Sequence, residues 1–330
     1  MKLLRLILLF MFFGVISLIF AEESKKVNYH KFSEMCMGAD FSILIDEDDH
    51  KKAEDGAKAA FLEAQRLNNV FSDYESESEL SLFSQRSGDE LFQPLSSDLL
   101  KILRISKELA VETEGAFDIT IGPFSRLWRI SRFKKMLPVE EKLEHAKKRV
   151  GYEKLILDFK NKQGKLLVSG MVLDLGGIAK GYAADRMLEV LKANKINRVL
   201  IDAGGDLLTG DAPRGKKGWK IDIGGRRHPD LPSLVLSNKA VATSGDMEQS
   251  ITFKGKTYSH LINPKSGIGL TTLSQVSVIA PTCMHADALA SATLVLGKSQ
   301  GIKFLKSKPL VKGYYLQKIE GNVILTKTHN

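Results

Sequence analysis

The stretch from Asp174 to Tyr182 (DLGGIAKGY) has the residue types of a phosphate-binding turn. Gly176 and Gly177 stand at the predicted start of a helix, where the missing Cβ lets the backbone approach a ligand. The N-terminus of a helix offers N–H groups and a partial positive charge to an anion, and Lys180 could add a point charge. The spacing matches neither GxxxxGK[ST] nor GxGxxG, so a tight strand-to-helix turn without a ligand explains the stretch equally well.

Asp287 and Ser291 lie four residues apart in an alanine-rich segment that is predicted to be helical, so both project from one face. A carboxylate among apolar residues is costly to bury unless it is paired or bound to a metal. A carboxylate and a hydroxyl, with room for backbone and phosphate oxygens, suit a hard cation such as Mg²⁺. A hydrogen-bonded polar pair without a metal is the alternative. Zinc is disfavoured because His260, His285 and Cys283 show no recognisable ligand spacing.

Three further segments carry residues that could bind a ligand or act in catalysis. His260 precedes a proline-containing turn and could be a general base near neutral pH, although a lone histidine is more often structural. Residues 116–118 are predicted to form a turn that exposes an aromatic ring and a carboxylate. Tyr74 lies in an acidic, polar stretch, where its ring could cover a planar ligand or cap the preceding helix.

The spacing of apolar residues predicts the elements that position these segments. Helices are expected over residues 51–72, 97–114, 178–192, 283–296 and 299–307, with Gly115 and Gly297 as stops. Strands are expected over 38–46, 199–201 and 219–223, followed by a C-terminal hairpin that turns at 320–322. Helices and strands do not alternate strictly and no linker divides the chain, so we expect one α+β domain.

The first 21 residues are predicted to be an export signal. Lys2 and Arg5 form a short basic region, Leu6 to Phe20 is almost uninterrupted in its apolar character, and Ala21 precedes polar residues. The apolar run is near the minimum length for spanning a bilayer, so residues 1–21 are either a cleaved signal or an uncleaved anchor. No cysteine follows the run to carry a lipid, and residues 22–330 form the expected domain.

The composition of the 330-residue chain argues against several classes of protein. Its 48 basic and 39 acidic side chains give a net charge of +9, without a basic stripe interleaved with aromatics. Nucleic acid is therefore not an expected partner, whereas a mild attraction to anionic lipid is compatible with this charge. Cys36 and Cys283 are too few for a disulfide scaffold, and two isolated buried thiols are favoured over one bond between them.

Taken together, these segments resemble the ApbE family of FAD:protein FMN transferases. Each motif is unspecific alone, but the set in this order is specific and extends over residues 37–297. The resemblance implies an α+β, T-fold-related single domain. The motifs are MGADFSI, FSDYESESELSLFSQ, GAFDITIGPFSRLW, LDLGGIAKGYAADR, LIDAGGDLLTGD, ATSGDMEQS, YSHLINPKSG and APTCMHADALASATLVLG.

The resemblance implies FAD as the substrate and Mg²⁺ as the cofactor. Magnesium is implied at the side chains of Asp287 and Ser291 and at a backbone oxygen near Gly177. His260 has the place of the base, so His260 and Asp287 are the expected catalytic residues. Contacts to FAD are implied at Met37, Tyr74, Ala116, Phe117, Asp118, Asp174, Lys180 and Ile262.

The implied reaction is attack by a threonine or serine hydroxyl of another protein on the FMN phosphorus of FAD, with AMP leaving. Implied acceptors are exported subunits of sodium-translocating NADH:quinone reductases and Rnf-type redox pumps, with a short Asp-[Ser/Thr]-[Gly/Ala]-Ala-Thr motif. We therefore expect a periplasmic enzyme at the membrane surface, anchored to the inner membrane if the signal is not cleaved. The alternatives are an FAD pyrophosphatase and a non-catalytic periplasmic FAD-binding protein.

The sequence departs from the family pattern at three positions in its motifs. Ser291 stands where threonine is commoner, and the hydroxyl oxygen is kept. Met247 replaces a more usual aromatic residue. Asn263 replaces the aspartate of the HxxDP pattern, which puts any role of that carboxylate in question.

Overall fold

The computed structural model describes residues 29–223, 231–245, 250–319 and 322–329. Residues 1–21, predicted to be an export signal, and Met247 lie outside this part of the chain. Within the described residues, no helix combines the length and the apolar character needed to cross a membrane.

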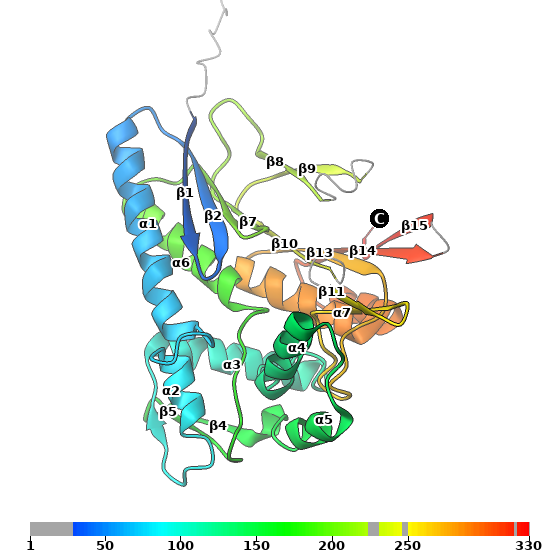
Figure 1. Ribbon diagram of the computed structural model, residues 1–330. Coiled ribbons are helices and arrows are strands. Elements are labelled where there is room, and N and C mark those ends of the chain that lie inside the picture. The colour runs from blue at the N-terminus through cyan, green and yellow to red at the C-terminus, as the bar shows by residue number, and fades with distance from the viewer. Residues whose placement is uncertain (1–28, 224–230, 246–249, 320–321, 330) are drawn as a thin grey trace, which may run out of the picture.

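An antiparallel sheet of eight strands forms the centre of the fold (Figure 1). Its strands come from both ends of the chain, and hairpins such as β1–β2 and β14–β15 form its edges. The α+β prediction is therefore confirmed. In spatial order the strands are β1 (Tyr29–Cys36), β2 (Ala39–Asp46), β6 (Val199–Ala203), β7 (Asp206–Thr209), β10 (Ala240–Gly245), β13 (Ser274–Ala280), β14 (Lys312–Ile319) and β15 (Asn322–Lys327).

Three helices cover one face of this sheet: α1 (His50–Phe71), α6 (Ala179–Ala193) and α7 (Cys283–Lys306). The buried face of α1 is mostly alanine at helical spacing, which lets α6 approach closely. Asp185 on α6 accepts hydrogen bonds from the N–H groups of Cys283 and Met284, at 2.8 and 3.0 Å, and so ties α6 to the start of α7. Both Cys36 and Cys283 are buried and unbonded, as predicted.

The other face of the sheet carries a smaller core. Alternate residues of β10, such as Ala240 and Val241, belong to the helix-covered core and to the opposite core respectively, as strand geometry requires. Trp219 and Ile221 of β8 (Trp219–Asp222), which pairs with β9 (Ser233–Leu236), fill the opposite core. The alternation predicted for residues 219–223 is thus confirmed as a strand that lies across the main sheet.

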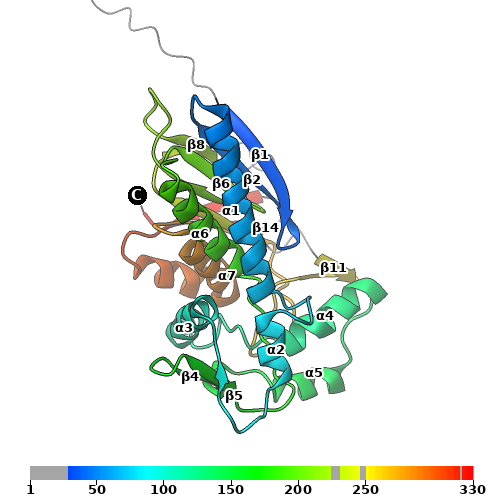
Figure 2. The same cartoon turned by 90° about the vertical axis from the view of Figure 1, so that its left-hand side faces the viewer.

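Shorter elements form a second layer below the helices (Figure 2). Part of this layer has a small core of its own, in which Phe124 and Trp128 pack with Ile251 and Ile262. The elements are α2 (Glu79–Gln85), β3 (Gln93–Pro94), α3 (Ser97–Glu112), α4 (Gly122–Lys134), α5 (Glu140–Lys147), η1 (Tyr152–Lys154), β4 (Leu155–Asp158), β5 (Gln163–Leu166), β11 (Ser250–Phe253) and β12 (Lys256–Ser259).

The observed helices agree with most of the predicted ones. Helix α3 is followed by Gly115, which has a positive φ of 79° and ends the segment as expected. Gly297 has φ 75° and ψ 173°, so it separates the predicted helices 283–296 and 299–307 within α7. The C-terminal hairpin is present, since Ile319 pairs with Asn322, although residues 320–321 are outside the described part. Strand β1 and helices α2, α4 and α5 were not predicted.

Gly181 is the point where α6 and α7 approach most closely, and we predict that it cannot be enlarged. A Cβ there would lie 2.5 Å from the carbonyl oxygen of Cys283 and 2.8 Å from the Cα of Met284. We expect Gly181→Ala to lower the free energy of unfolding by about 1–3 kcal/mol, measured by urea denaturation, despite the better helix propensity of alanine. Gly56→Ala is the matched control, because its Cβ would meet the flexible end of Ile196. Equal stability of the two variants would contradict this prediction.

Candidate active site

A cavity of about 940 Å³ lies between the helices that cover the main sheet, helix α4 and the segment that follows β12. This volume is near the upper end of the range for small-molecule sites. The cavity brings together every site residue predicted from the sequence, although their roles in binding and catalysis remain predictions. These residues are Met37, Tyr74, Ala116, Phe117, Asp118, Asp174, Gly177, Lys180, His260, Ile262, Asp287 and Ser291.

The turn that leads into α6 is held by its own hydrogen bonds. The carboxylate of Asp174 accepts from the N–H of Gly176 at 2.8 Å, and the N–H of Ala179 donates to the carbonyl of Leu175 at 2.9 Å. The N–H of Gly181 points at the carboxylate of Asp287, 3.4 Å away. The helix start is therefore directed partly at a protein carboxylate, and binding of a phosphate by its N–H groups stays a prediction.

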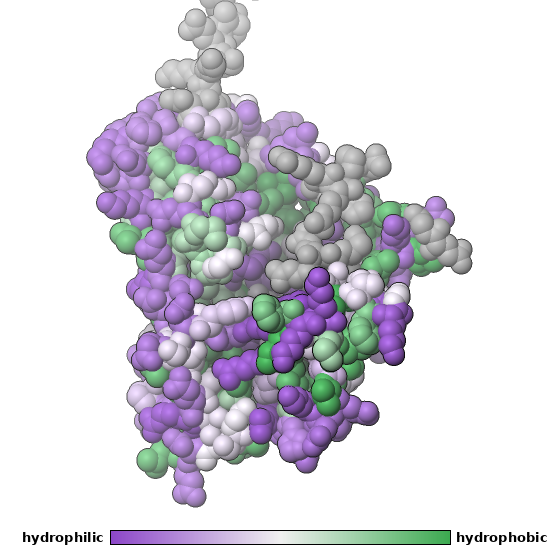
Figure 3. Space-filling model, viewed as in Figure 1, coloured by the Kyte–Doolittle hydropathy of each residue, from purple (hydrophilic) through white to green (hydrophobic). Residues whose placement is uncertain are grey.

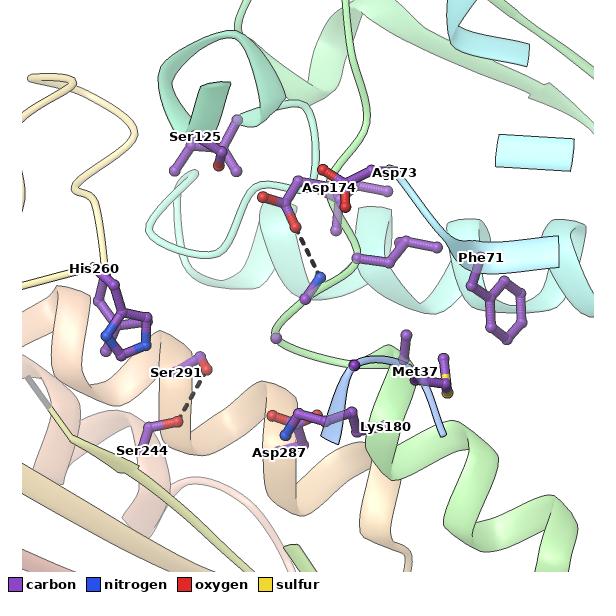
Figure 4. Close-up of a pocket in the computed structure, with 18 of the residues that line it drawn as sticks. Met37, Phe71, Asp73, Ser125, Asp174, Lys180, Ser244, His260, Asp287 and Ser291 are labelled. Atoms are coloured by element: carbon purple, nitrogen blue, oxygen red, sulfur yellow. Dashed lines mark hydrogen bonds between the residues drawn. The ribbon is translucent and has the colours of Figure 1, made fainter. Parts of the chain in front are cut away.

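Lys180 forms an ion pair with Asp206, with 2.6 Å between Nζ and Oδ2. Burial disfavours the ammonium form, but the carboxylates of Asp287 and Asp206 outweigh it and raise the pKa of Lys180. Figure 4 shows the Lys180 amine beside Asp287. The charge of Lys180 is thus partly neutralised by Asp206, and its contact with a ligand stays a prediction. The sequence analysis did not identify Asp206 as a site residue. Its only signal there is a carboxylate that follows Gly204-Gly205 at the start of an apolar strand.

Asp287 is almost fully buried on α7, with 4% of its surface exposed. Burial, together with the nearby Asp206, raises the pKa of Asp287 to about 7, while Lys180 and the N–H of Gly181 oppose the shift. Burial also raises the pKa of Asp206, against the effect of Lys180. Two carboxylates therefore share one ammonium group at the floor of the cavity, and Asp287 gains or loses its proton near neutral pH.

Oxygen atoms gather beside Asp287. The hydroxyls of Ser291 and Ser244 lie 3.0 Å apart (Figure 4). A Cβ on Gly177 would be 3.2 Å from the Ser291 hydroxyl, so the Gly177 backbone lies against Ser291. The described residues contain no group of three or more His, Cys, Asp or Glu side chains suited to a metal. One carboxylate with hydroxyl and backbone oxygens fits a hard cation that takes its remaining ligands from a phosphate or water. Ser244 was not predicted.

His260 lies on the cavity wall, on the same side as Ser291 (Figure 4). It follows β12, and its neighbours hold it in place. The N–H of Ser259 donates to the carbonyl of Leu270 at 2.7 Å, and the N–H of Leu261 donates to the Ser259 hydroxyl at 3.0 Å. The backbone on both sides of His260 is therefore fixed, as a catalytic base requires.

Asn263 organises the turn after His260. Its side-chain oxygen accepts from the N–H of Lys265 at 2.9 Å, and its carbonyl accepts from the N–H of Gly267 at 2.8 Å. The carbonyl of Gly267 in turn accepts from the Trp128 indole at 2.8 Å, which joins the turn to α4. An amide oxygen performs the turn-forming role as well as a carboxylate oxygen does, so the change from aspartate leaves this local structure intact.

Arg129 of α4 bridges two acidic residues at the opposite wall. Its guanidinium lies 2.6 Å from Asp73 and 3.5 Å from Asp174, and 4.0 Å from the centre of the Tyr74 ring. Burial and the neighbouring Asp174 raise the pKa of Asp73, against the effect of Arg129. The Tyr74 ring, 75% exposed, thus packs on a cation and leaves its other side for a planar ligand. Arg129 was missed because α4 was not predicted.

The turn at residues 116–118 is buried, so our prediction that it exposes a ring and a carboxylate was wrong. Phe117 and Asp118 are each 7% exposed. The Asp118 carboxylate accepts from the N–H and hydroxyl of Thr120 and from the N–H of Tyr152, at 2.7–2.9 Å. Burial nevertheless raises its pKa. These hydrogen bonds fix the turn at residues 116–118, which forms part of the cavity wall.

Two more predicted residues sit at the rim and in the wall. Met37, with a positive φ of 52°, forms the turn between β1 and β2 together with Gly38. Ile262 is buried in the small core under α4, which carries the loop after β12. Segments distant in sequence are thus brought to one cavity by the sheet and by this small core.

Comparison with known proteins gives consistent matches. The sequence model of the ApbE family matches residues 37–315. The FAD:protein FMN transferase of Haemophilus influenzae is 30% identical over 254 residues, which cover 74% of this chain and 73% of the relative. That of Chlamydia muridarum is 31% identical over 252 residues, with 74% and 77% covered. The ApbE protein of Thermotoga maritima superposes with a TM-score of 0.80 at 26% identity, covering 91% of this chain and 97% of the other.

The shared ammonium group yields a prediction for Lys180→Met. We expect a loss of about 3–5 kcal/mol in the free energy of unfolding near neutral pH, because the carboxylates of Asp206 and Asp287 are left buried without a counter-charge. A carboxyl whose pKa is higher in the folded than in the unfolded state loses stability as the pH rises between the two values. Since the pKa of Asp287 is about 7, the loss should be smaller at about pH 5 than at about pH 8.

The control for this prediction is the double variant Lys180→Met with Asp206→Asn, which removes one of the two uncompensated charges. It should recover part of the lost stability in a denaturation series measured at both pH values. No recovery, together with a loss that does not change with pH, would show that Lys180 contributes through packing instead.

Proposed function

This chain belongs to the ApbE family, and from that premise we propose that it transfers FMN from FAD to a threonine or serine hydroxyl of another protein, releasing AMP. The observation that carries the proposal is the single cavity, where an oxygen-rich floor at Asp287 and Ser291 faces His260 on the adjoining wall. The names of the curated relatives supply FAD and the protein acceptor. The loss of AMP follows because FMN and AMP are the two halves of FAD.

The floor of the cavity would hold a magnesium ion through the Asp287 carboxylate, the Ser291 hydroxyl and a backbone oxygen near Gly177. These donors fit because they are hard oxygen ligands of the kind that Mg²⁺ prefers. A bound cation would also lower the free-energy cost of burying the Asp287 carboxylate. A bound Mg²⁺ would supply charge neutralisation at the pyrophosphate of FAD. The Lys180 ammonium favours the ionised form of Asp287, against the effects of burial and of the neighbouring Asp206 carboxylate.

The protein's own groups perform the remaining steps. His260 accepts the proton of the acceptor hydroxyl as the oxygen attacks the FMN phosphorus, and the bond from that phosphorus to the bridging oxygen of AMP breaks. AMP leaves with the electron pair of that bond. Tyr74, supported by Arg129, offers aromatic surface to the rings of FAD and holds it in place for in-line attack, and the largely buried Phe117 lines the same cavity.

We also propose that the reaction takes place outside the cytoplasm, in the periplasm. The support is the basic and apolar N-terminal pattern of residues 1–21. Exported redox-pump subunits with a threonine or serine flavinylation motif would then be the acceptors, and an uncleaved N-terminal segment would anchor the enzyme to the inner membrane.

The proposal predicts that the purified chain, given FAD and Mg²⁺, attaches FMN to a peptide that carries the acceptor motif. Mass spectrometry of the peptide should show the added FMN, and AMP should appear in an equal amount. A control peptide in which alanine and valine replace the hydroxyl residues should stay unmodified. Free FMN and AMP with an unmodified motif peptide would instead establish an FAD pyrophosphatase, and bound FAD without turnover would establish a flavin-binding protein.

The variant His260→Ala separates catalysis from binding in the same assay. We expect the transfer rate to fall by about 10²–10⁴-fold, the usual contribution of a positioned general base, with FAD affinity within a few-fold of the wild type. Asn263→Asp is the matched control, since it preserves the turn and should leave the rate nearly unchanged. An unchanged rate for His260→Ala would assign the proton transfer to another group.

A further inference from the structure

The C-terminal end of α4 carries an exposed group of large apolar side chains. Phe133 is 89% exposed, Met136 is 59% exposed and Ile130 is 52% exposed. In Figure 2 this end of α4 is the outermost point on the right-hand side of the molecule. We refer to Ile130, Phe133, Lys134, Lys135 and Met136 as the α4 tip. A protruding phenylalanine is costly to leave in water, so the α4 tip is a surface whose exposure needs an explanation.

Positive charge surrounds these apolar side chains. The segment from Gly122 to Met136 contains no acidic residue and has basic residues at 126, 129, 132, 134 and 135. Arg129 points inward to its acidic partners, whereas Arg126, Lys134 and Lys135 are exposed. The neighbouring helix α5 has three glutamates, but the residues from 140 to 149 also include four lysines and arginines. The surface at the α4 tip therefore keeps an excess of positive charge.

A second turn with an aromatic residue and lysines lies on the same side of the molecule as the α4 tip. The turn between β11 and β12 has the sequence Phe253-Lys254-Gly255-Lys256, and the Lys254 ammonium lies 5.6 Å from the Phe253 ring centre. The small core joins this hairpin to α4, where the rings of Tyr258 and Trp128 are 5.7 Å apart. Figure 2 shows β11 and the end of α4 on the same side. The two turns thus lie on the same side of the molecule.

We propose that the α4 tip and the β11–β12 turn dock the enzyme on an anionic lipid surface. Interleaved apolar and cationic side chains, seen over α4 in Figure 3, suit the boundary between headgroups and acyl chains: the apolar groups enter it and the lysines reach the headgroups.

The position of this surface gives the docking a function. Arg132 lines the cavity, and the next residue, Phe133, projects into solvent. A bilayer against the α4 tip would therefore lie close to the cavity rim, within reach of an acceptor hydroxyl presented at the membrane surface. The inference goes beyond the proposed transfer reaction, and binding to vesicles can be measured without FAD and without an acceptor.

The test places a polarity-sensitive fluorophore on Phe133→Cys in the full chain. Cys36 and Cys283 are buried, so labelling is directed to the new thiol. We expect the emission to shift to the blue with phosphatidylcholine vesicles that contain phosphatidylglycerol, and to shift much less with phosphatidylcholine alone. Leu310→Cys is the control: Leu310 is 75% exposed and follows α7, which ends on the opposite side in Figure 2, so its label should not respond.

Charge reversal completes the test. Lys134→Glu with Lys135→Glu, in the Phe133→Cys background, should raise the lipid concentration at the midpoint of the shift by roughly tenfold or more, since each cation near an anionic surface adds substantially to binding. The same variant should transfer FMN to a soluble peptide at the wild-type rate. The proposal is overturned if the Phe133 label does not respond to anionic vesicles, if the Leu310 label responds equally, or if the label responds only to an added acceptor protein.

Discussion

The arrangement of this protein depends on a charge that is expensive to bury. Asp287 lies in the interior of α7, and Asp206 lies close by at the start of β7. The ammonium of Lys180 and backbone N–H groups compensate these two carboxylates only in part. Removing a carboxylate from water without a partner costs several kcal/mol. The protein offsets part of this cost by holding α6 against α7. Gly181 allows the close approach and Asp185 binds the start of α7, so that Lys180 and the start of α6 face the two carboxylates. A cation bound to Asp287 would neutralise the negative charge that Lys180 leaves uncompensated.

The walls of the cavity follow from a second set of contacts, made by the small core under α4. Trp128 connects α4 to the turn after His260, and Arg129 on the same helix connects it to Asp73 and Asp174. One helix therefore aligns the proposed base with the aromatic wall that would hold FAD. The same helix ends in the α4 tip, so that catalysis and the inferred membrane docking share one rigid element. A small displacement of α4 would affect both.

Much of this arrangement was predictable from the sequence, and the parts that were not have physical reasons. Alanine spacing in α1 and the glycine stop at Gly297 report local structure, so these elements were predicted correctly. Asp206 and Ser244 matter only because distant strands place them beside α6 and α7, and no local pattern shows such a contact. Helix α4 was not predicted, although Pro123 at its start and the spacing of the buried Phe124 and Trp128 are typical helix signals. The turn at Asp118 was misjudged because polar residues suggested exposure, whereas hydrogen bonds from Thr120 and Tyr152 allow its burial.

We propose that the buried carboxylate at the cavity floor binds a divalent cation. The most direct measurement is an anomalous difference map from crystals of the enzyme soaked with Mn²⁺ and FAD, since manganese prefers the same oxygen ligands as magnesium and has a usable anomalous signal. We expect one strong peak within bonding distance of the Asp287 carboxylate, the Ser291 hydroxyl and a backbone oxygen near Gly177. This peak should be absent from crystals of Asp287→Ala. A cavity that binds FAD with no peak at Asp287, or a peak that persists in Asp287→Ala, would contradict it.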